Sequence, residues 1–216
     1  MFSCTTDKYD TLYARWLEHS GDLLDLAGWK PGMRLLDFCG GTGAVTREAL
    51  RRGAEPQTLT LYDTRPRLSL PFITQVSGDA AEVGDILYNR SYDVVVCRQA
   101  VAYLNLHSHV FQGVCDILKT GGVFVFNSFI RPKWAWKKYE YKRHRYIEAS
   151  GFIGRWVMHL QWCRGAGWDI SLFRWHTEEE IQKALTGFNV EIYRSERGLR
   201  WICTKPMQVQ VKGASA

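Results

Sequence analysis

The stretch RLLDFCGGTGAVTREALRRG, residues 34–53, contains the pattern that decides the fold. Residues 34–39 form an apolar run of the kind found in strands that are buried on both faces of a sheet. Residues 43–53 have the spacing of a helix, and Gly53 predicts where that helix stops. A strand, a glycine-rich loop and a helix in this order predict the first unit of a mostly parallel α/β sheet.

The rest of the chain continues this alternation. Further strands are predicted at 58–63, 72–79, 92–98 and 122–129. The apolar positions 110, 111, 114, 117 and 118 predict a helix that Gly121 and Gly122 stop, and a capping box from Thr177 to Glu180 opens a helix to about Leu185. NVEIYRSE and LRWICTK, split by Arg197 and Gly198, predict an antiparallel hairpin. The expected fold class is therefore α/β, with a doubly wound, mostly parallel seven-stranded sheet that ends in an antiparallel C-terminal hairpin.

Length and composition predict a single domain over residues 1–205. It has an amphipathic helical lead-in within 1–30, an inserted lid over 130–176 on the substrate side, and a flexible tail at 206–216. No apolar run approaches the roughly 20 residues that a membrane span needs, and the N-terminus lacks the layout of a signal peptide. These features predict a cytoplasmic protein with no membrane partner.

The six cysteines show no CxxC pair and no metal-ligand spacing, so neither a disulfide framework nor a metal site is expected.

The positive charge is concentrated in one segment. RPKWAWKKYEYKRHRY, residues 131–146, holds seven Lys or Arg residues and one Glu, and this balance equals the net charge of +6 of the whole chain. The chain therefore has a local basic, aromatic patch rather than a generally basic surface.

Three aspartates end the first three predicted strands, namely Asp37, Asp63 and Asp79. In doubly wound sheets, ligands bind beyond the carboxyl ends of the strands, so these carboxylates are expected to line one crevice. Asp63 follows Gly43 by 20 residues, the spacing at which an acidic residue meets a ribose hydroxyl pair. Asp79 could accept a hydrogen bond from an adenine amino group. The alternative is that each aspartate only caps a turn or helix.

Asp37 distinguishes between the possible ligands of the glycine-rich loop. A carboxylate at the mouth of the loop would repel a pyrophosphate and attract a cation. GTGAVT, residues 41–46, lacks the third glycine of a dinucleotide-binding loop, and no GKS or GKT of a P-loop is present. The expected ligand carries adenosine at one end and positive charge at the other, which S-adenosylmethionine does.

Four segments together resemble the cofactor half of class I, Rossmann-like S-adenosylmethionine-dependent methyltransferases of the small-molecule type. They are LLDFCGGTGAVTREAL, LYD, SGDA and YDVVVCRQAVAYL. The resemblance covers roughly 9–129 and 177–205, and Cys39 departs from it because the family usually has a glycine there. It implies that Asp37, Gly41 and Gly43 hold the methionine portion, Asp63 the ribose, and Asp79 with Ala80 the adenine. Residues 97–99 would border the methionine portion, and the helix bearing Tyr9, Tyr13 and Trp16 would close over the cofactor. The expected cofactor-binding set is Tyr13, Asp37, Gly41, Gly43, Asp63, Thr64, Asp79, Ala80, Cys97 and Arg98.

Methyl transfer from a sulfonium is an in-line displacement, so positioning is the main requirement. A general base is needed only if the acceptor must lose a proton, and the candidates are Tyr103, His159 and His176. The candidate acceptor-binding residues are Tyr9, Tyr103, Asn127, Trp134, Tyr139 and Arg174.

The insertion leaves three functional hypotheses open. It can act as a lid over a small acidic or aromatic acceptor that is methylated on oxygen or nitrogen. Its basic aromatic segment can instead contact RNA. A non-catalytic cofactor-binding or partner protein is the third hypothesis, against which the three intact aspartates and the loop glycines argue. The limited basic footprint favours a small molecule.

Overall fold

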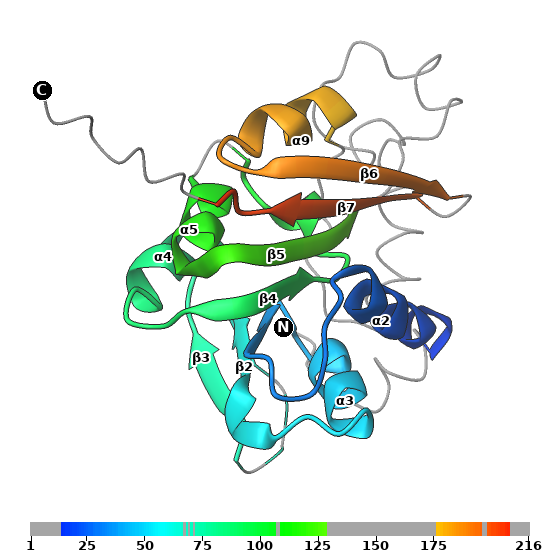
Figure 1. The fold of residues 1–216 in the computed structure, drawn as a ribbon, viewed down its shortest axis with the longest axis vertical. Coiled ribbons are helices and arrows are strands. Elements are labelled where there is room, and N and C mark those ends of the chain that lie inside the picture. The colour runs from blue at the N-terminus through cyan, green and yellow to red at the C-terminus, as the bar shows by residue number, and fades with distance from the viewer. Residues whose placement is uncertain are drawn as a thin grey trace, which may run out of the picture.

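The computed structural model describes residues 14–66, 68, 70, 72–106, 109–128, 176–195 and 198–207. Its sheet has seven strands in the order β3-β2-β1-β4-β5-β7-β6 (Figure 1). The first five strands run parallel to one another, and β7 pairs antiparallel with both β5 and β6. The predicted sheet with its antiparallel hairpin is thus confirmed. The strands are β1 (Leu35–Phe38), β2 (Leu59–Asp63), β3 (Thr74–Ser77), β4 (Tyr92–Cys97), β5 (Leu118–Ser128), β6 (Asn189–Ser195) and β7 (Gly198–Thr204).

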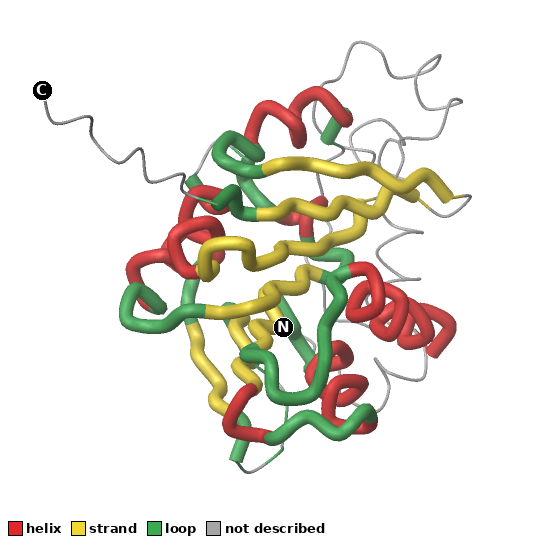
Figure 2. Tube along the Cα trace, viewed as in Figure 1, coloured by secondary structure: helices red, strands yellow, loops and turns green. Residues whose placement is uncertain are grey.

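Helices cover both faces of the sheet, as Figures 1 and 2 show. On one face, α2 (Ala14–Leu26) and α3 (Ala44–Arg51) bury Leu23, Leu24 and Val45 against apolar residues of β1, β2 and β4. On the other face, α4 (Val83–Ile86), α5 (Val110–Ile117) and α9 (Glu178–Ala184) pack against the apolar residues that β1, β2 and β4 present on that face. The central strands are therefore buried on both sides, as their apolar runs predict.

The C-terminal hairpin is anchored by a buried aromatic residue. The Trp201 ring on β7 stacks on Phe126 of β5 with centroids 5.6 Å apart, and its Nε1 donates a hydrogen bond to Ser128 Oγ at 2.8 Å. The predicted capping box is present at α9, where Thr177 Oγ1 accepts from Glu180 N and Glu180 Oε2 accepts from Thr177 N. The Trp201 contacts hold β7 onto β5, and the capping box fixes the start of α9.

The structure corrects the prediction at the end of α5. The helix ends at Ile117, and Leu118 already belongs to β5, where it pairs with Tyr92 before an irregularity shifts the register to Val94 and Val123. Gly121 and Gly122 consequently lie inside the strand instead of ending a helix. Leu118 is apolar and buried in either arrangement, so the helical spacing alone could not distinguish them.

Smaller differences concern element ends. β3 covers Thr74–Ser77, shorter than the predicted 72–79, and Gly198 opens β7 instead of belonging to the turn. The 3₁₀ helices η1 (Pro56–Thr58), η2 (Ala80–Glu82) and η3 (Val101–Tyr103), and the four-residue α4, were not predicted because such short pieces lack periodicity.

Of the predicted insertion only His176 is described, and the tail beyond Met207 likewise lies outside the described residues. Of the helices described, none has both the length and the apolar character that a membrane crossing requires.

Candidate functional site

The site lies where the strand order reverses. β1 pairs with β2 on one side and with β4 on the other. The chain therefore leaves the carboxyl ends of the neighbouring strands β1 and β4 in opposite directions. Such a switch point opens a crevice beyond the strand ends. The glycine-rich loop follows β1 there, and residues 98–103 follow β4.

Asp37 is buried beneath the loop. Its Oδ2 accepts hydrogen bonds from Thr46 N at 3.0 Å and Thr46 Oγ1 at 2.8 Å, in the first turn of α3. Its Oδ1 is buried and has no hydrogen-bond partner among the described residues. Burial raises the pKa of Asp37 to about 6, while the bonds from Thr46 and the charge of Arg98 act in the opposite direction. Oδ2 of Asp37 thus bonds the first turn of α3, whereas Oδ1 is a buried acceptor without a partner among the described residues.

The loop backbone explains the residues that occupy it. A Cβ on Gly40 would come within 2.5 Å of Asp37 Cγ, so only glycine allows this approach. Cys39 has φ +56°, a conformation that favours glycine, which accounts for the glycine usual in the family at this position. The Cys39 thiol hydrogen-bonds Cys97, and this contact together with burial raises the pKa of Cys39 well above its usual value. Cys39 is therefore a packing residue with an unreactive thiol.

Asp63 connects the end of β2 to the loop. Its Oδ2 accepts from Gly41 N at 3.0 Å and its Oδ1 accepts from Arg65 N at 2.8 Å, with Thr64 Oγ1 farther away at 3.4 Å. A Cβ on Gly41 would have open space around it, and its nearest neighbour would be Asp63 Oδ2 at 4.0 Å. The space over Gly41 and beside Asp63 is thus available to a ligand. Gly43, also predicted here, precedes α3 with φ +75°.

Asp79 lies after β3 and caps η2, since its Oδ1 accepts from Ala81 N at 2.9 Å. Tyr62 Oη donates to the Asp79 carbonyl at 2.6 Å, which ties this turn to β2. The Asp79 residue is exposed and Ala80 is half-buried. The three predicted aspartates therefore do lie at the carboxyl ends of adjacent strands, Asp37 within β1, Asp63 as the last residue of β2 and Asp79 just after β3, and each also has a local structural contact.

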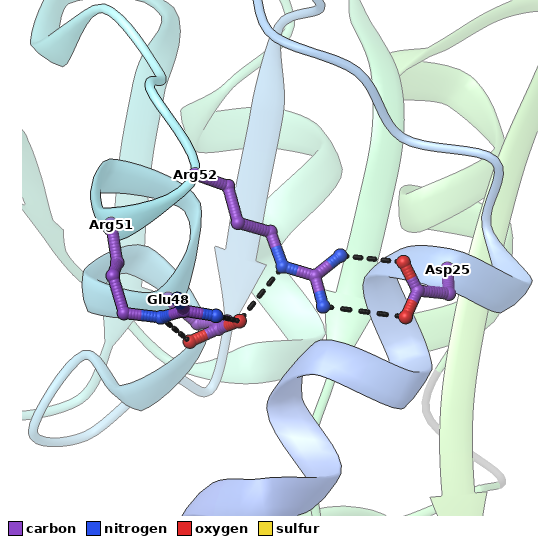
Figure 3. Close-up of polar contacts among 4 residues, drawn as sticks. All are labelled: Asp25, Glu48, Arg51 and Arg52. Carbon is purple, nitrogen blue, oxygen red and sulfur yellow. Dashed lines mark hydrogen bonds and ion pairs between the residues drawn. The ribbon is translucent and has the colours of Figure 1, made fainter.

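Arg98 attaches the lead-in helix to the crevice. Its Nη1 donates to Ser20 Oγ of α2 at 3.2 Å, and its charge acts on Asp37. Two further ion pairs hold α2: Asp22 with Arg200 of β7, and Asp25 with Arg52 at the end of α3 (Figure 3). Cys97 is fully buried, so its side chain does not line the crevice. Sequence patterns pointed to neither Ser20 nor Thr46, although a threonine in the first turn after a glycine-rich loop was a usable signal.

Besides Arg98 and Arg200, which both contact α2, the ends of β4 and β5 carry polar side chains without charge. Gln99 has φ +59°, and its backbone N donates to Asn127 Oδ1 at 2.7 Å. Tyr103 is half-buried at the end of η3. His176 Nε2 lies 3.1 Å from the carbonyl oxygen of Leu104, so the structure brings His176 next to the segment that carries Tyr103. Because a carbonyl only accepts, this contact is a hydrogen bond when Nε2 carries a proton.

The remaining predicted site residues lie outside the described residues. They are Tyr9, Tyr13, Trp134, Tyr139, His159 and Arg174. Their assignments stay predictions.

The described residues fit a ligand that carries positive charge. Asp37 and Asp63 both face the glycine-rich loop, and the unpartnered Oδ1 of Asp37 is a buried acceptor. An ammonium or sulfonium group would offset the cost of burying this carboxylate, whereas a phosphate would increase it.

Comparison with protein families matches residues 11–195 to the methyltransferase domain. The chain belongs to this family. It carries a methyltransferase domain, and the cofactor expected from Asp37, Asp63 and Asp79 is S-adenosylmethionine. In this methyltransferase the match extends from the lead-in to the end of β6.

One curated relative is the ubiquinone biosynthesis O-methyltransferase of Proteus mirabilis (strain HI4320), 24% identical over 155 residues. The alignment covers 60% of this chain and 61% of that protein, so the chain spans less than two thirds of its relative.

Two solved structures share the fold. A putative S-adenosylmethionine-dependent methyltransferase from Methanococcus maripaludis is 15% identical, with a TM-score of 0.60 over 95% of this chain and 92% of that one. The magnesium protoporphyrin IX methyltransferase of Synechocystis PCC 6803 is 14% identical, with a TM-score of 0.54 over 92% and 84% of the two chains.

The space over Gly41 gives a direct test of cofactor placement. Gly41→Ala and Gly53→Ala each introduce a Cβ at a positive φ with open surroundings, so both variants should lose a similar amount of stability, about 1 kcal/mol. Only Gly41 borders the crevice. We expect Gly41→Ala to weaken S-adenosylmethionine binding by about tenfold or more in isothermal titration, and Gly53→Ala to leave it unchanged. Equal affinities for the two variants would contradict this placement.

Proposed function

We propose that this methyltransferase transfers the methyl group of S-adenosylmethionine to an oxygen or nitrogen atom of a small-molecule acceptor. The observation that carries the proposal is the chemistry of the β4 and β5 ends, where Gln99, Tyr103 and Asn127 offer neutral hydrogen-bonding groups. Arg98, which also follows β4, donates to Ser20 and interacts with Asp37. This side of the crevice suits a small polar molecule better than a phosphate backbone, which needs many cationic contacts.

The curated relative supports an oxygen acceptor. The Proteus protein is named as an O-methyltransferase of ubiquinone biosynthesis. A phenolic or otherwise aromatic hydroxyl is therefore the first acceptor to test. It also agrees with the expectation of an acidic or aromatic small molecule.

The cofactor supplies a methyl group on a good leaving group, and the chain supplies position. Asp63 binds the ribose hydroxyls, Asp79 with Ala80 borders the adenine, and Asp37 attracts the positive methionine end. The contacts of α2 with Arg98, Arg200 and Arg52 hold the helix on the sheet, where it helps to exclude water. Orientation of this kind can supply about 7–11 kcal/mol of the barrier reduction.

His176 is the best-supported candidate for proton removal. The 3.1 Å contact of its Nε2 with the Leu104 carbonyl places the ring beside the segment that carries Tyr103, where a neutral imidazole could accept a proton. Tyr103 lies one residue before Leu104 and would border the acceptor. His176 also connects α9 to η3, so a purely structural role remains the competing hypothesis for this residue.

RNA methylation and a non-catalytic role are the competing functions. The first depends on 131–146, which lies outside the described residues, and no described contact favours it. The second is disfavoured because the loop glycines, Asp37 and Asp63 form one connected arrangement.

The acceptor class can be determined with cofactor that carries a tritiated methyl group. The full chain is incubated with a panel of catechols, phenols, aromatic acids and amines, and in parallel with total RNA. We expect label in a small-molecule product, independent of moderate salt. Label in RNA alone, with a steep loss between about 50 and 200 mM salt as expected of phosphate contacts, would contradict the proposal. Cofactor binding without any transfer would support the non-catalytic role.

A further inference from the structure

Gln99 is held in a conformation that a glutamine rarely adopts. It directly follows the end of β4 and Arg98, and its φ is +59°. Positive φ values are unfavourable for residues with a Cβ, and they persist where the surrounding structure imposes them. Such residues are concentrated at ligand-binding and catalytic sites.

Asn127 bonds the backbone of Gln99 from the neighbouring strand. The register between β4 and β5 pairs Cys97 with Phe126, which brings Asn127 beside the residues that follow β4. Its Oδ1 accepts a 2.7 Å hydrogen bond from Gln99 N. Since Asn127 uses this oxygen for the Gln99 backbone, its contact with the site runs through Gln99.

The side-chain amide of Gln99 is buried without a partner. The residue is only 8% exposed, and Nε2 has no hydrogen-bond partner among the described residues. Buried donors are nearly always paired in folded proteins, and Trp201 Nε1 on the nearby β7 is an example, bonded to Ser128. A ligand oxygen would supply the acceptor that this amide lacks.

The position of Gln99 indicates which ligand this is. The three aspartates assigned to the cofactor lie at β1, β2 and β3, on one side of the point where the strand order reverses, whereas Cys97 and Arg98 at the end of β4 are expected to border only its methionine portion. Gln99 and Asn127 lie at β4 and β5, on the other side. An amide N–H suits an oxygen atom and does not suit an ammonium or sulfonium, so the carboxylate is the competing partner at the methionine end of the cofactor, and the cofactor affinity of a Gln99 variant decides between the two.

We propose that Gln99 binds the methyl acceptor by donating a hydrogen bond from Nε2 to an acceptor oxygen, and that Asn127 is the residue that positions Gln99. This inference rests on the proposed function and narrows it: the acceptor carries a hydroxyl, carbonyl or carboxylate oxygen at or beside the methylated atom. An acceptor with only amine groups would leave the Gln99 amide unpaired, and the site would select against it.

The test compares Gln99→Met, which keeps the length of the side chain and removes its donor, with Gln112→Met. Gln112 is an exposed residue of α5 whose amide bonds Asp116, away from the crevice. With the catechol and aromatic-acid panel as acceptors, we expect Gln99→Met to lower kcat/KM by about tenfold to a hundredfold, mainly through KM. Its affinity for S-adenosylmethionine should stay within about twofold of the wild-type value. Gln112→Met should match the wild type in all of these measurements.

The thermal midpoint of the cofactor-free protein separates a binding role from a structural one. A glutamine whose amide were bonded inside the protein would destabilise it when replaced, whereas removal of an unpaired buried donor should leave Tm equal or higher. A lowered Tm for Gln99→Met, or an unchanged kcat/KM, would overturn the inference.

Asn127→Ala tests the positioning role through a double-variant cycle. If Asn127 acts only by holding Gln99, the double variant Gln99→Met with Asn127→Ala should have the kcat/KM of Gln99→Met alone. Additive losses would overturn this part of the inference. Wild-type transfer to oxygen-free amines only would overturn the assignment of Gln99 while leaving methyl transfer to a small molecule intact. No transfer to any small molecule would overturn the proposed function itself.

Discussion

Replacing Asp63 by alanine is expected to weaken S-adenosylmethionine binding by about a hundredfold or more. A carboxylate that accepts both ribose hydroxyls makes two charge-assisted hydrogen bonds, and their loss corresponds to about 3 kcal/mol. The variant should still fold, because Asp63 is half-buried and its contacts with Gly41 and Arg65 lie in loops outside the apolar core. Loss of these two backbone contacts should lower stability by only about 1–2 kcal/mol.

Asp93→Ala is the matched control for this measurement. The Asp93 carboxylate also accepts one backbone N–H, from Arg34 at 2.8 Å, and it pairs with Lys119 at 2.6 Å. It lies near the start of β4, at the opposite end of this strand from the crevice. Isothermal titration at about pH 7.5 should therefore show unchanged cofactor affinity for Asp93→Ala and severe weakening for Asp63→Ala. Similar affinities for both variants would contradict the ribose assignment.

Asp37→Asn is expected to make cofactor binding weak and independent of pH between about 5 and 8. The wild-type carboxyl has a pKa of about 6 because it is buried, so its negative charge is lost as the pH falls below that value. Wild-type affinity for S-adenosylmethionine should then decrease by roughly tenfold for each pH unit well below that pKa. The bound positive charge should also release a proton near pH 6, which titrations in buffers of different ionisation enthalpy would detect.

The same substitution should stabilise the cofactor-free protein at neutral pH. The pKa of Asp37 in the folded protein, about 6, is above its value of 3.8 in an unfolded chain, so the folded state binds the proton more tightly. The resulting stabilisation is complete below pH 3.8 and is lost as the pH rises through 6. Asparagine cannot ionise, and it can still accept the bonds from Thr46.

Urea unfolding at several pH values measures this contribution as a difference between variant and wild type. The difference should favour Asp37→Asn by about 2–3 kcal/mol at about pH 7.5 and should shrink toward about pH 4. The difference is needed because other carboxylates have lowered pKa values, such as Glu48. They make the stability of both proteins rise with pH, and this common contribution cancels when the variant is compared with the wild type. A variant that is less stable than the wild type at neutral pH would show that the ionised carboxylate stabilises the fold.

The sheet was predictable because its strands are apolar runs that need burial on both faces. Leu35, Leu36 and Phe38 show this, since they divide between the two core clusters. The error at Leu118 arose because one buried leucine satisfies both a helical face and a strand. Only pairing with Tyr92, which is distant in the chain, decides between them.

The candidate site was predictable as a set of strand-end carboxylates but not as a geometry. The positions of Asp37 and Asp63 at the ends of apolar runs identify them in the sequence. Burial of Asp37 under Gly40, and its bonds to Thr46, depend on the path of the loop in three dimensions. The strained Gln99 could not be recognised either, because its backbone is bonded to Asn127 on a different strand.

Whether the ends of β1, β2 and β3 hold the cofactor is tested most directly by a crystal structure of the full chain with S-adenosylhomocysteine. We expect the ribose hydroxyls on the Asp63 carboxylate, the homocysteine chain over Gly41, the amino end toward Asp37, and the adenine beside Asp79. The sulfur should then face the β4 side of the crevice, toward Gln99. A ligand bound elsewhere, or a ribose without contact to Asp63, would contradict the assignment.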